Sequence, residues 1–225
     1  MGQRTRAASV RRRRGKRRRF DAPLTIALTL AIVLALFGVY SLTHCGRVGD
    51  RVEIPDWIKG DLIQVNEYSR PRTKLKKING VVIHYVGNPG TTAEQNRNYF
   101  NNLASTHETS ASAHFVVGLD GEIIQCVPLT EIAYCSSSRN VDTVSIEACH
   151  PDASGKFNDE TMDSVVRLTA WLCEEFDLTT DDVIRHYDVT GKLCPLYYVE
   201  HPDAWEKFLD DVDARIIEDE NSVKK

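Results

Sequence analysis

The body of the chain alternates short apolar runs with longer segments of helical periodicity. Short apolar runs rich in β-branched residues and bounded by Gly, Asn or Asp are typical of buried strands. Segments whose apolar residues recur every three to four positions are typical of helices packed on a core. The alternation predicts an α/β fold with a central mixed β-sheet flanked by helices. The predicted strands cover 80–87, 114–118, 122–127, 143–149 and 183–186, and the predicted helices cover 93–105, 158–176 and 204–217.

Two local signals in this body are especially clear. Between Asn158 and Phe176 the apolar positions recur at helical spacing, with Asn158 where a cap belongs. Two acidic residues, Asp159 and Glu160, fall in the first turn, where they suit the helix dipole. The segment 119–121 carries an Asp-Gly step between two predicted strands, which indicates a β-hairpin.

A charge-free apolar span precedes this body. Residues 24–42 contain no Asp, Glu, Lys or Arg and are about as long as a helix that crosses a bilayer. A buried core helix seldom remains apolar on every face, and a cleaved signal peptide usually has a shorter apolar region. A lipoprotein anchored at Cys45 is a further alternative, although His44 stands where a lipobox has a small residue. We expect an uncleaved N-terminal transmembrane helix.

The distribution of charge orients this span. Ten of the 28 Lys and Arg residues lie within 4–19, where no acidic residue occurs, and the remaining 18 face 32 acidic residues, a balance of −14. Basic residues stay on the cytoplasmic side of a membrane, so the domain after the span should lie outside it. Because an acidic body repels nucleic acid, a nucleic-acid or nuclear role for the basic head is the weaker interpretation.

These signals predict a single-pass protein of the cell membrane with a cytoplasmic N-terminus and an extracytoplasmic working domain. The predicted parts are a basic tail at 1–23, the anchor at 24–42, a stalk or linker packing on the domain at 43–77, the working domain at 78–217 and a charged tail at 218–225.

The sequence does not determine how the cysteines pair in disulfides. The six cysteines stand at 45, 126, 135, 149, 173 and 194, in a compartment where disulfides are possible. If Cys194 binds a metal, five remain, so at least one thiol stays free or finds another partner. The four other cysteines of the working domain allow three full pairings.

Three residues are candidate metal ligands. His84 interrupts an apolar predicted strand, and His186 and Cys194 lie eight residues apart across a loop. Catalytic zinc typically takes three protein ligands from His, Cys or carboxylate and leaves a fourth position for water. Spacing alone does not separate this interpretation from a buried core histidine and a chance His–Cys pair.

Four stretches, read together, point to one family. They are VVIH at 81–84, SAHFVVGLDGEIIQ at 112–125, VSIE at 144–147 and HYDVTGKLCP at 186–195. In this order they resemble the zinc amidases of the N-acetylmuramoyl-L-alanine amidase type, a superfamily that includes phage lysozyme-type amidases and peptidoglycan recognition proteins. The resemblance covers roughly half of the chain. It implies that Zn²⁺ is the cofactor and that His84, His186 and Cys194 are its ligands.

Glu147 and Lys192 are the predicted catalytic residues. Zinc lowers the pKa of a bound water toward about 7 and polarises a carbonyl group. Glu147 interrupts an apolar run where an unpaired charge would be costly, so a polar cleft or a metal should lie near it. We therefore expect Glu147 to be the general base and later the proton donor. The resemblance implies that Lys192 stabilises the oxyanion; a surface carboxylate and a solvated lysine are the plainer alternatives.

The sequence departs from its relatives at two points. Ala113 stands where phage lysozyme-type amidases have a catalytic tyrosine, a change that other members combine with a glutamate matching Glu147. The pair at 134–135 is Tyr-Cys, where relatives often have Trp-His near the substrate. Strand alternation predicts that His114 is a core residue. The remaining histidines, at 44, 107, 150 and 201, match no motif and are read as surface residues.

The resemblance implies a hydrolase that cleaves the amide between N-acetylmuramic acid and the L-alanine of the stem peptide in peptidoglycan. A domain tethered outside the membrane would meet the cell wall first, which agrees with a peptidoglycan (muropeptide) substrate. The alternative is a catalytically inactive peptidoglycan-binding receptor of the same fold, but such members typically lack a metal ligand. A membrane protein with an unrelated domain would leave the ordered motifs to chance. The oligomeric state is not indicated.

Overall fold

A six-stranded mixed sheet forms the centre of the computed structural model, which describes Ile32 and residues 52–223. The chain separates into two compact units, Met1–Cys45 and Gly46–Lys225, and the fold below is that of the second. Apart from Ile32, the predicted anchor at 24–42 lies outside the described residues, as does the basic head. Within the described part of the chain, no helix has the length and apolar character needed to cross a membrane.

The sheet is parallel except at one hairpin. Its spatial order is β1-β4-β3-β5-β2-β6, and only β3 and β4 run antiparallel. The strands are β1 (Ile58–Gly60), β2 (Val81–Tyr85), β3 (Phe115–Val117), β4 (Ile123–Gln125), β5 (Val144–Ala148) and β6 (Val183–Arg185). Five of these match predicted strands, and the Asp-Gly segment joins the antiparallel pair as predicted.

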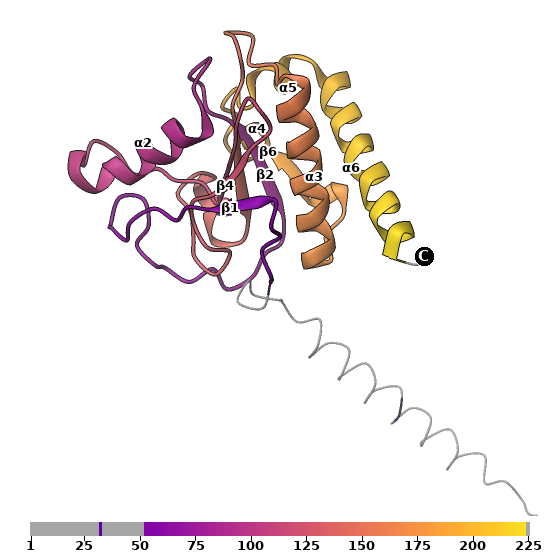
Figure 1. Ribbon diagram of the computed structural model, residues 1–225, viewed down its shortest axis with the longest axis horizontal. Coiled ribbons are helices and arrows are strands. Elements are labelled where there is room, and N and C mark those ends of the chain that lie inside the picture. The colour runs from indigo at the N-terminus through magenta and orange to yellow at the C-terminus, as the bar shows by residue number, and fades with distance from the viewer. Residues whose placement is uncertain (1–31, 33–51, 224–225) are drawn as a thin grey trace, which may run out of the picture. The chain divides into compact units, whose positions relative to one another are not determined.

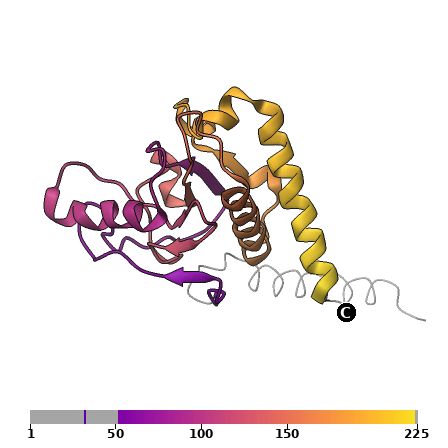
Figure 2. The same cartoon turned by 45° about the horizontal axis from the view of Figure 1, so that its top comes forward.

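Helices cover both faces of the sheet. Figures 1 and 2 show α2 on one side and α3, with α6 outside it, on the other. The helices are α2 (Ala93–Thr106), α3 (Asp159–Phe176), α4 (His186–Thr190), α5 (Leu196–Glu200) and α6 (Pro202–Val223), with short 3₁₀ helices η2 (Ser137–Val141) and η3 (Thr180–Asp182). The predicted mixed sheet flanked by helices is confirmed.

The local sequence explains where helices α2 and α3 begin. The Asn158 side chain accepts the Thr161 backbone N–H, so it caps α3 as predicted. Thr92 and Gln95 form a reciprocal capping box at the start of α2. The closing helix α6 is longer than predicted, because it starts at Pro202 and ends at Val223.

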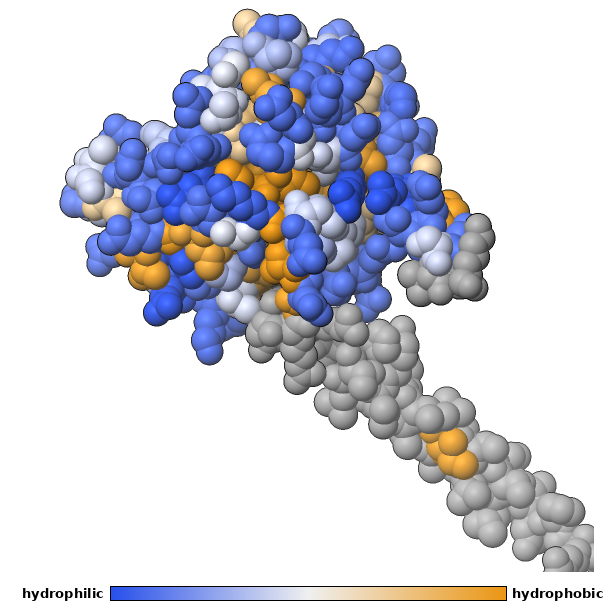
Figure 3. Space-filling view, viewed as in Figure 1, coloured by the Kyte–Doolittle hydropathy of each residue, from blue (hydrophilic) through white to orange (hydrophobic). Residues whose placement is uncertain are grey.

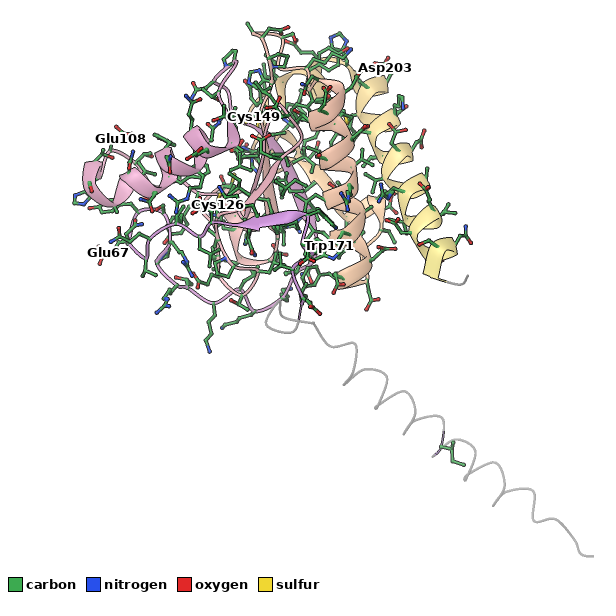
Figure 4. All side chains as sticks on the ribbon, in the orientation of Figure 1. Glu67, Glu108, Cys126, Cys149, Trp171 and Asp203 are labelled. Atoms are coloured by element: carbon green, nitrogen blue, oxygen red, sulfur yellow. The ribbon has the colours of Figure 1, made fainter. Side chains whose placement is uncertain are left out.

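Side chains alternate along each strand, so the two faces of the sheet carry different residues and form two separate cores. Val81 and Ile83 pack with Phe115, Val117 and the apolar side of α3 in the larger core. Residues one position along each strand point the other way, toward α2. That smaller core contains Cys126 and Cys149, which Figure 4 labels between α2 and α3. His84 and Glu147 belong by alternation to this α2 face.

The segment before the predicted working domain takes part in the fold. Within the stretch predicted as a stalk, β1 pairs in parallel with β4 at the edge of the sheet. Ile63 and Leu75 are fully buried. Arg70 donates two hydrogen bonds to the Glu131 carboxylate, at 2.8 and 2.9 Å, and a third to the Ile63 carbonyl. This segment therefore packs on the sheet, mostly without regular structure.

The surface is chiefly polar. Figure 3 shows a mainly hydrophilic face with apolar residues gathered near its centre. None of the described cysteines forms a disulfide, so the structure contains none of the three pairings that the sequence left open.

Candidate metal centre

The strand register places His84 beside Glu147. β2 and β5 are parallel neighbours, and these two residues are direct partners across the pair. In-register partners project from the same face of a sheet. The sequence separates them by 63 positions, so only the pairing of β2 with β5 brings the predicted ligand next to the predicted base.

β6 delivers the second histidine from the opposite flank of β2. Arg185 closes β6 as the partner of Ile83, so His186 follows beside His84. The two imidazole rings have their centroids 4.6 Å apart. Arg185 itself is fixed by an ion pair to Asp188 and a hydrogen bond to the Tyr198 carbonyl. His186 is thus held at the junction of a strand and the short helix α4.

The chain then turns back to present Cys194. Gly191 ends α4 in the left-handed region, at φ 76°, where glycine is favoured. The Tyr187 N–H donates to the Cys194 carbonyl at 2.9 Å, which closes the loop. As a result, Cys194 Sγ lies 3.8 Å from His84 Nδ1. The ligand atoms of His84, His186 and Cys194 all lie within 4.8 Å of one another.

This donor set fits a zinc ion. Tetrahedral zinc with bonds of about 2.1 Å to nitrogen and about 2.3 Å to sulfur holds these atoms roughly 3.6 Å apart. The observed 3.8 Å between His84 Nδ1 and Cys194 Sγ needs only a small adjustment. A second group, His84, Cys135 and Glu147, meets the same 4.8 Å distance, but Cys135 there hydrogen-bonds the carboxylate. The set with two imidazoles and a thiol is the better match to a catalytic zinc site.

The electrostatic environment favours uncharged ligands. Burial, together with His186 and Lys192, holds the pKa of His84 well below its usual value. Burial and Lys192 also lower the pKa of His186. Burial, reinforced by Glu147, raises the pKa of the Cys194 thiol to about 12. The imidazoles are therefore ready to donate lone pairs, whereas the thiol needs a cation beside it to ionise near neutral pH.

Glu147 has the surroundings of a proton-transfer residue. Burial raises the pKa of Glu147 to about 8, although the Cys135 hydrogen bond and Lys192 act in the opposite direction. Its Oε1 accepts from the Cys135 thiol at 3.4 Å. Its Oε2 is buried and, among the described residues, has no hydrogen-bond partner. A buried oxygen left without a partner indicates a site that a water, an ion or a substrate completes.

One cavity of about 230 Å³ contains all five predicted site residues. Lys192 is exposed on the loop after α4 and contributes its positive charge to this cavity. The full lining is His84, Tyr85, Val86, Gly87, Phe100, Ala111, Ser112, Tyr134, Cys135, Glu147, His186, Lys192 and Cys194. The structure thus collects the predicted residues in one place, and Tyr134 and Cys135 lie beside them.

The other histidines divide as follows. His114 is buried, with Nδ1 accepting the Ser145 N–H at 3.0 Å and Nε2 donating to the Glu131 carbonyl at 3.0 Å, so the predicted core role is confirmed. His107 and His201 are exposed, as predicted.

The prediction that His150 is a surface residue is wrong, because this residue is only 1% exposed. Its ring lies 5.0 Å from that of Tyr85, and its Nδ1 forms a hydrogen bond with the Asp152 carbonyl. No periodic pattern marks this loop position, so the sequence carried no signal for its burial.

Sequence reasoning also missed Ser136. Its side chain is 1% exposed and its Oγ lies 3.1 Å from His84 Nε2. A serine in a polar loop carries no periodic or motif signal, so only the folded chain identifies this contact.

Solved structures of other proteins share this fold. The catalytic domain of XlyA superposes with a TM-score of 0.59 at 26% identity, over 69% of this chain and 98% of that one. The Staphylococcus aureus hydrolase AmiA, solved with its ligand, has a TM-score of 0.55 at 19% identity, over 76% of this chain and 87% of that one, a likeness of fold alone.

The family follows from the sequence comparisons. Residues 74–196, more than half of the chain, match the family model described as N-acetylmuramoyl-L-alanine amidase, and the chain belongs to this family. The amidase CwlL of Bacillus licheniformis is 32% identical over 167 residues, and the amidase BlyA of Bacillus subtilis strain 168 is 31% identical over 175. Each alignment covers 68% of this chain and 46% of the relative, so the chain spans about half the length of these curated relatives.

Proposed function

We propose that the protein is a zinc-dependent hydrolase that cleaves the amide bond between N-acetylmuramic acid and L-alanine in peptidoglycan. The observation that carries this proposal is the meeting of His84, His186 and Cys194 with Glu147 and Lys192 in one cavity. Family membership and the activity named for the relatives support the choice of bond.

His84, His186 and Cys194 would hold the ion, with Cys194 as thiolate. When bound, zinc supplies Lewis acidity to the scissile carbonyl and lowers the pKa of water. Glu147 then takes a proton from the attacking water through the unpartnered Oε2 and later passes it to the leaving amine. Burial raises the pKa of Glu147, which favours the protonated form between the two steps, whereas the positive charge of Lys192 favours the carboxylate that accepts the proton.

Lys192 and the cavity walls complete the chemistry. The exposed ammonium group of Lys192 stabilises the oxygen that becomes negative as the carbonyl is attacked. Burial of His84 and of Glu147 Oε2 reduces competing hydration, which strengthens the electrostatic interactions inside the site. The chain's own groups therefore provide a base, an acid and a positive charge around one carbonyl position.

The proposal extends to the location of the enzyme. The apolar span at 24–42 would anchor it in the cell membrane, with the basic head in the cytoplasm and the amidase domain outside. The support is the hydropathy and charge pattern alone. Membrane fractionation, with protease added to intact cells and then to lysed ones, tests it. A shortened, freely secreted form as the main species would reject the anchor.

Release of stem peptides from purified peptidoglycan tests the activity. The full chain in detergent should expose new L-alanine amino termini, lose this activity with a chelator and regain it with added zinc. The variant His186→Ala should remain inactive after zinc is added, while His201→Ala, an exposed histidine outside the cavity, should behave as the parent chain does. A folded, zinc-loaded chain that binds peptidoglycan without releasing peptides would instead support the receptor alternative.

A further inference from the structure

The loop that leads into η2 places Ser136 against the side of the His84 ring that faces away from Cys194. His84 turns Nδ1 toward Cys194 Sγ, which assigns this nitrogen to the metal side. Nε2 on the far side of the ring lies 3.1 Å from Ser136 Oγ, and both side chains are 1% exposed. A histidine that binds metal through Nδ1 keeps its proton on Nε2, so the His84 N–H donates to the Ser136 hydroxyl.

The residue before this serine contacts the predicted base in the same manner. The Cys135 thiol donates to Glu147 Oε1 at 3.4 Å. Oε1 is engaged in this way, whereas Oε2 is buried and has no partner in the part of the chain that the structure describes. The thiol therefore fixes which carboxylate oxygen is available for a proton.

One side chain holds both residues in place. Asn140 Oδ1 accepts the backbone N–H groups of Cys135 and Ser136, at 3.1 and 2.5 Å. Asn140 belongs to η2, and the hydroxyl of Thr143, the residue directly before β5, donates a hydrogen bond to the Arg139 carbonyl of this helix. The two residues are thus presented as a unit, with one side chain directed to His84 and the next to Glu147.

We propose that Cys135 and Ser136 are positioning residues of the active site: Ser136 orients the metal ligand His84, and Cys135 orients the base Glu147. This inference rests on the proposed function. Partners of a ligating histidine typically contribute about 10–100-fold to metal affinity or activity.

Zinc affinity tests the Ser136 contact without any substrate. In competition with a chromophoric chelator, Ser136→Ala in the full chain should bind zinc about 10–100-fold more weakly than the parent chain. Ser112→Ala is the matched control, since Ser112 is as deeply buried as Ser136 and lines the site cavity, but its Oγ accepts the Tyr134 backbone N–H instead of contacting His84. Equal affinity of the parent chain and Ser136→Ala would overturn the inference. If Ser136→Ala fails to fold, Ser136→Cys, with a weak acceptor of larger size, takes its place.

Kinetics combined with affinity test the Cys135 contact. Cys135→Ala should keep zinc affinity within about threefold, since the thiol does not bind the metal, and should lower kcat by about tenfold with little change in KM. Cys135→Ser retains a hydrogen-bond donor and should restore kcat. Weaker zinc binding by Cys135→Ala would make Cys135 a ligand and overturn the assignment, as would equal loss of kcat in both variants.

Failure of the proposed function gives a different result from failure of this inference. A parent chain that binds zinc but releases no stem peptide would remove the proposed function and, with it, the role of Cys135. The zinc affinity of Ser136→Ala would still decide the role of Ser136.

Discussion

The two faces of the central sheet show how one set of strands serves stability on one side and chemistry on the other. On the α3 side, Val81, Ile83 and Ile146 are at most 1% exposed and belong to the larger apolar core, to which α3 contributes several buried residues. On the α2 side, the same two strands place the polar side chains of Ser145, Glu147 and His84 beside the apolar Val82. Groups of this kind are costly to bury, so the α2 face can keep them only by pairing them or by leaving them beside a cavity.

The comparison shows that alternate residues of one strand can serve different purposes, because one set packs in the core while the other set lines the site. The α3 face is filled to the density of a core, where a lost methylene group is felt. The α2 face has a cavity beside Glu147, and one oxygen of this side chain has no hydrogen-bond partner among residues 52–223. We therefore expect substitutions on the α3 face to change stability and those on the α2 face to change activity.

The largest expected effect is on the α2 face. Glu147→Gln should reduce kcat by about 10²–10⁴-fold, because the amide cannot accept and return a proton. The free energy of unfolding should hold or increase, since a buried acid with an unpartnered oxygen is replaced by a neutral group. Peptide-release kinetics and urea unfolding measure the two quantities. A large loss of stability with kcat preserved would contradict the division between the faces.

The α3 face should respond in the opposite way. Leu168→Ala removes a fully buried side chain of α3 and should lower the free energy of unfolding by about 2–5 kcal/mol. Activity per folded molecule should stay within about twofold of the parent chain, because the cavity is formed on the other face. Ile217→Ala on α6 is the control, since that side chain is 61% exposed and its loss should change stability by no more than about 0.5 kcal/mol.

A smaller effect, and one that appears only in acid, is expected at His114. Burial holds the pKa of His114 at about 4, and Nδ1 already accepts the Ser145 N–H, so the fold retains the neutral ring. Between its ordinary pKa of about 6.5 and about 4 the unfolded chain binds a proton that the folded chain does not. Stability should therefore fall by up to about 3 kcal/mol as the pH is lowered through this window, and should be fully present above it.

Urea unfolding at several pH values between 4 and 8 measures this effect. His114→Gln should be less stable at neutral pH, because it loses packing and a fixed acceptor, but the difference from the parent chain should shrink as the pH falls. A difference that is constant across the range would show that His114 does not contribute to the acid sensitivity.

The sequence by itself determined the local elements and the types of residue available for chemistry. Periodicity located five strands and three helices, and the cap at Asn158 fixed the start of α3. The interruption of an apolar run by Glu147 already indicated a nearby polar cleft, which the cavity supplies. These signals are readable because they depend on neighbours within a few positions of the same strand or helix.

Only the tertiary structure decided which of those elements lie side by side. The order β5-β2-β6 sets His84 between Glu147 and His186, and neither that order nor the register is written in local periodicity. The edge strand β1, the burial of His150 and the approach of Ser136 to His84 likewise arise between segments far apart in sequence. Such contacts form because the whole chain must bury its apolar faces together and satisfy its buried polar groups, a requirement that no single segment expresses alone.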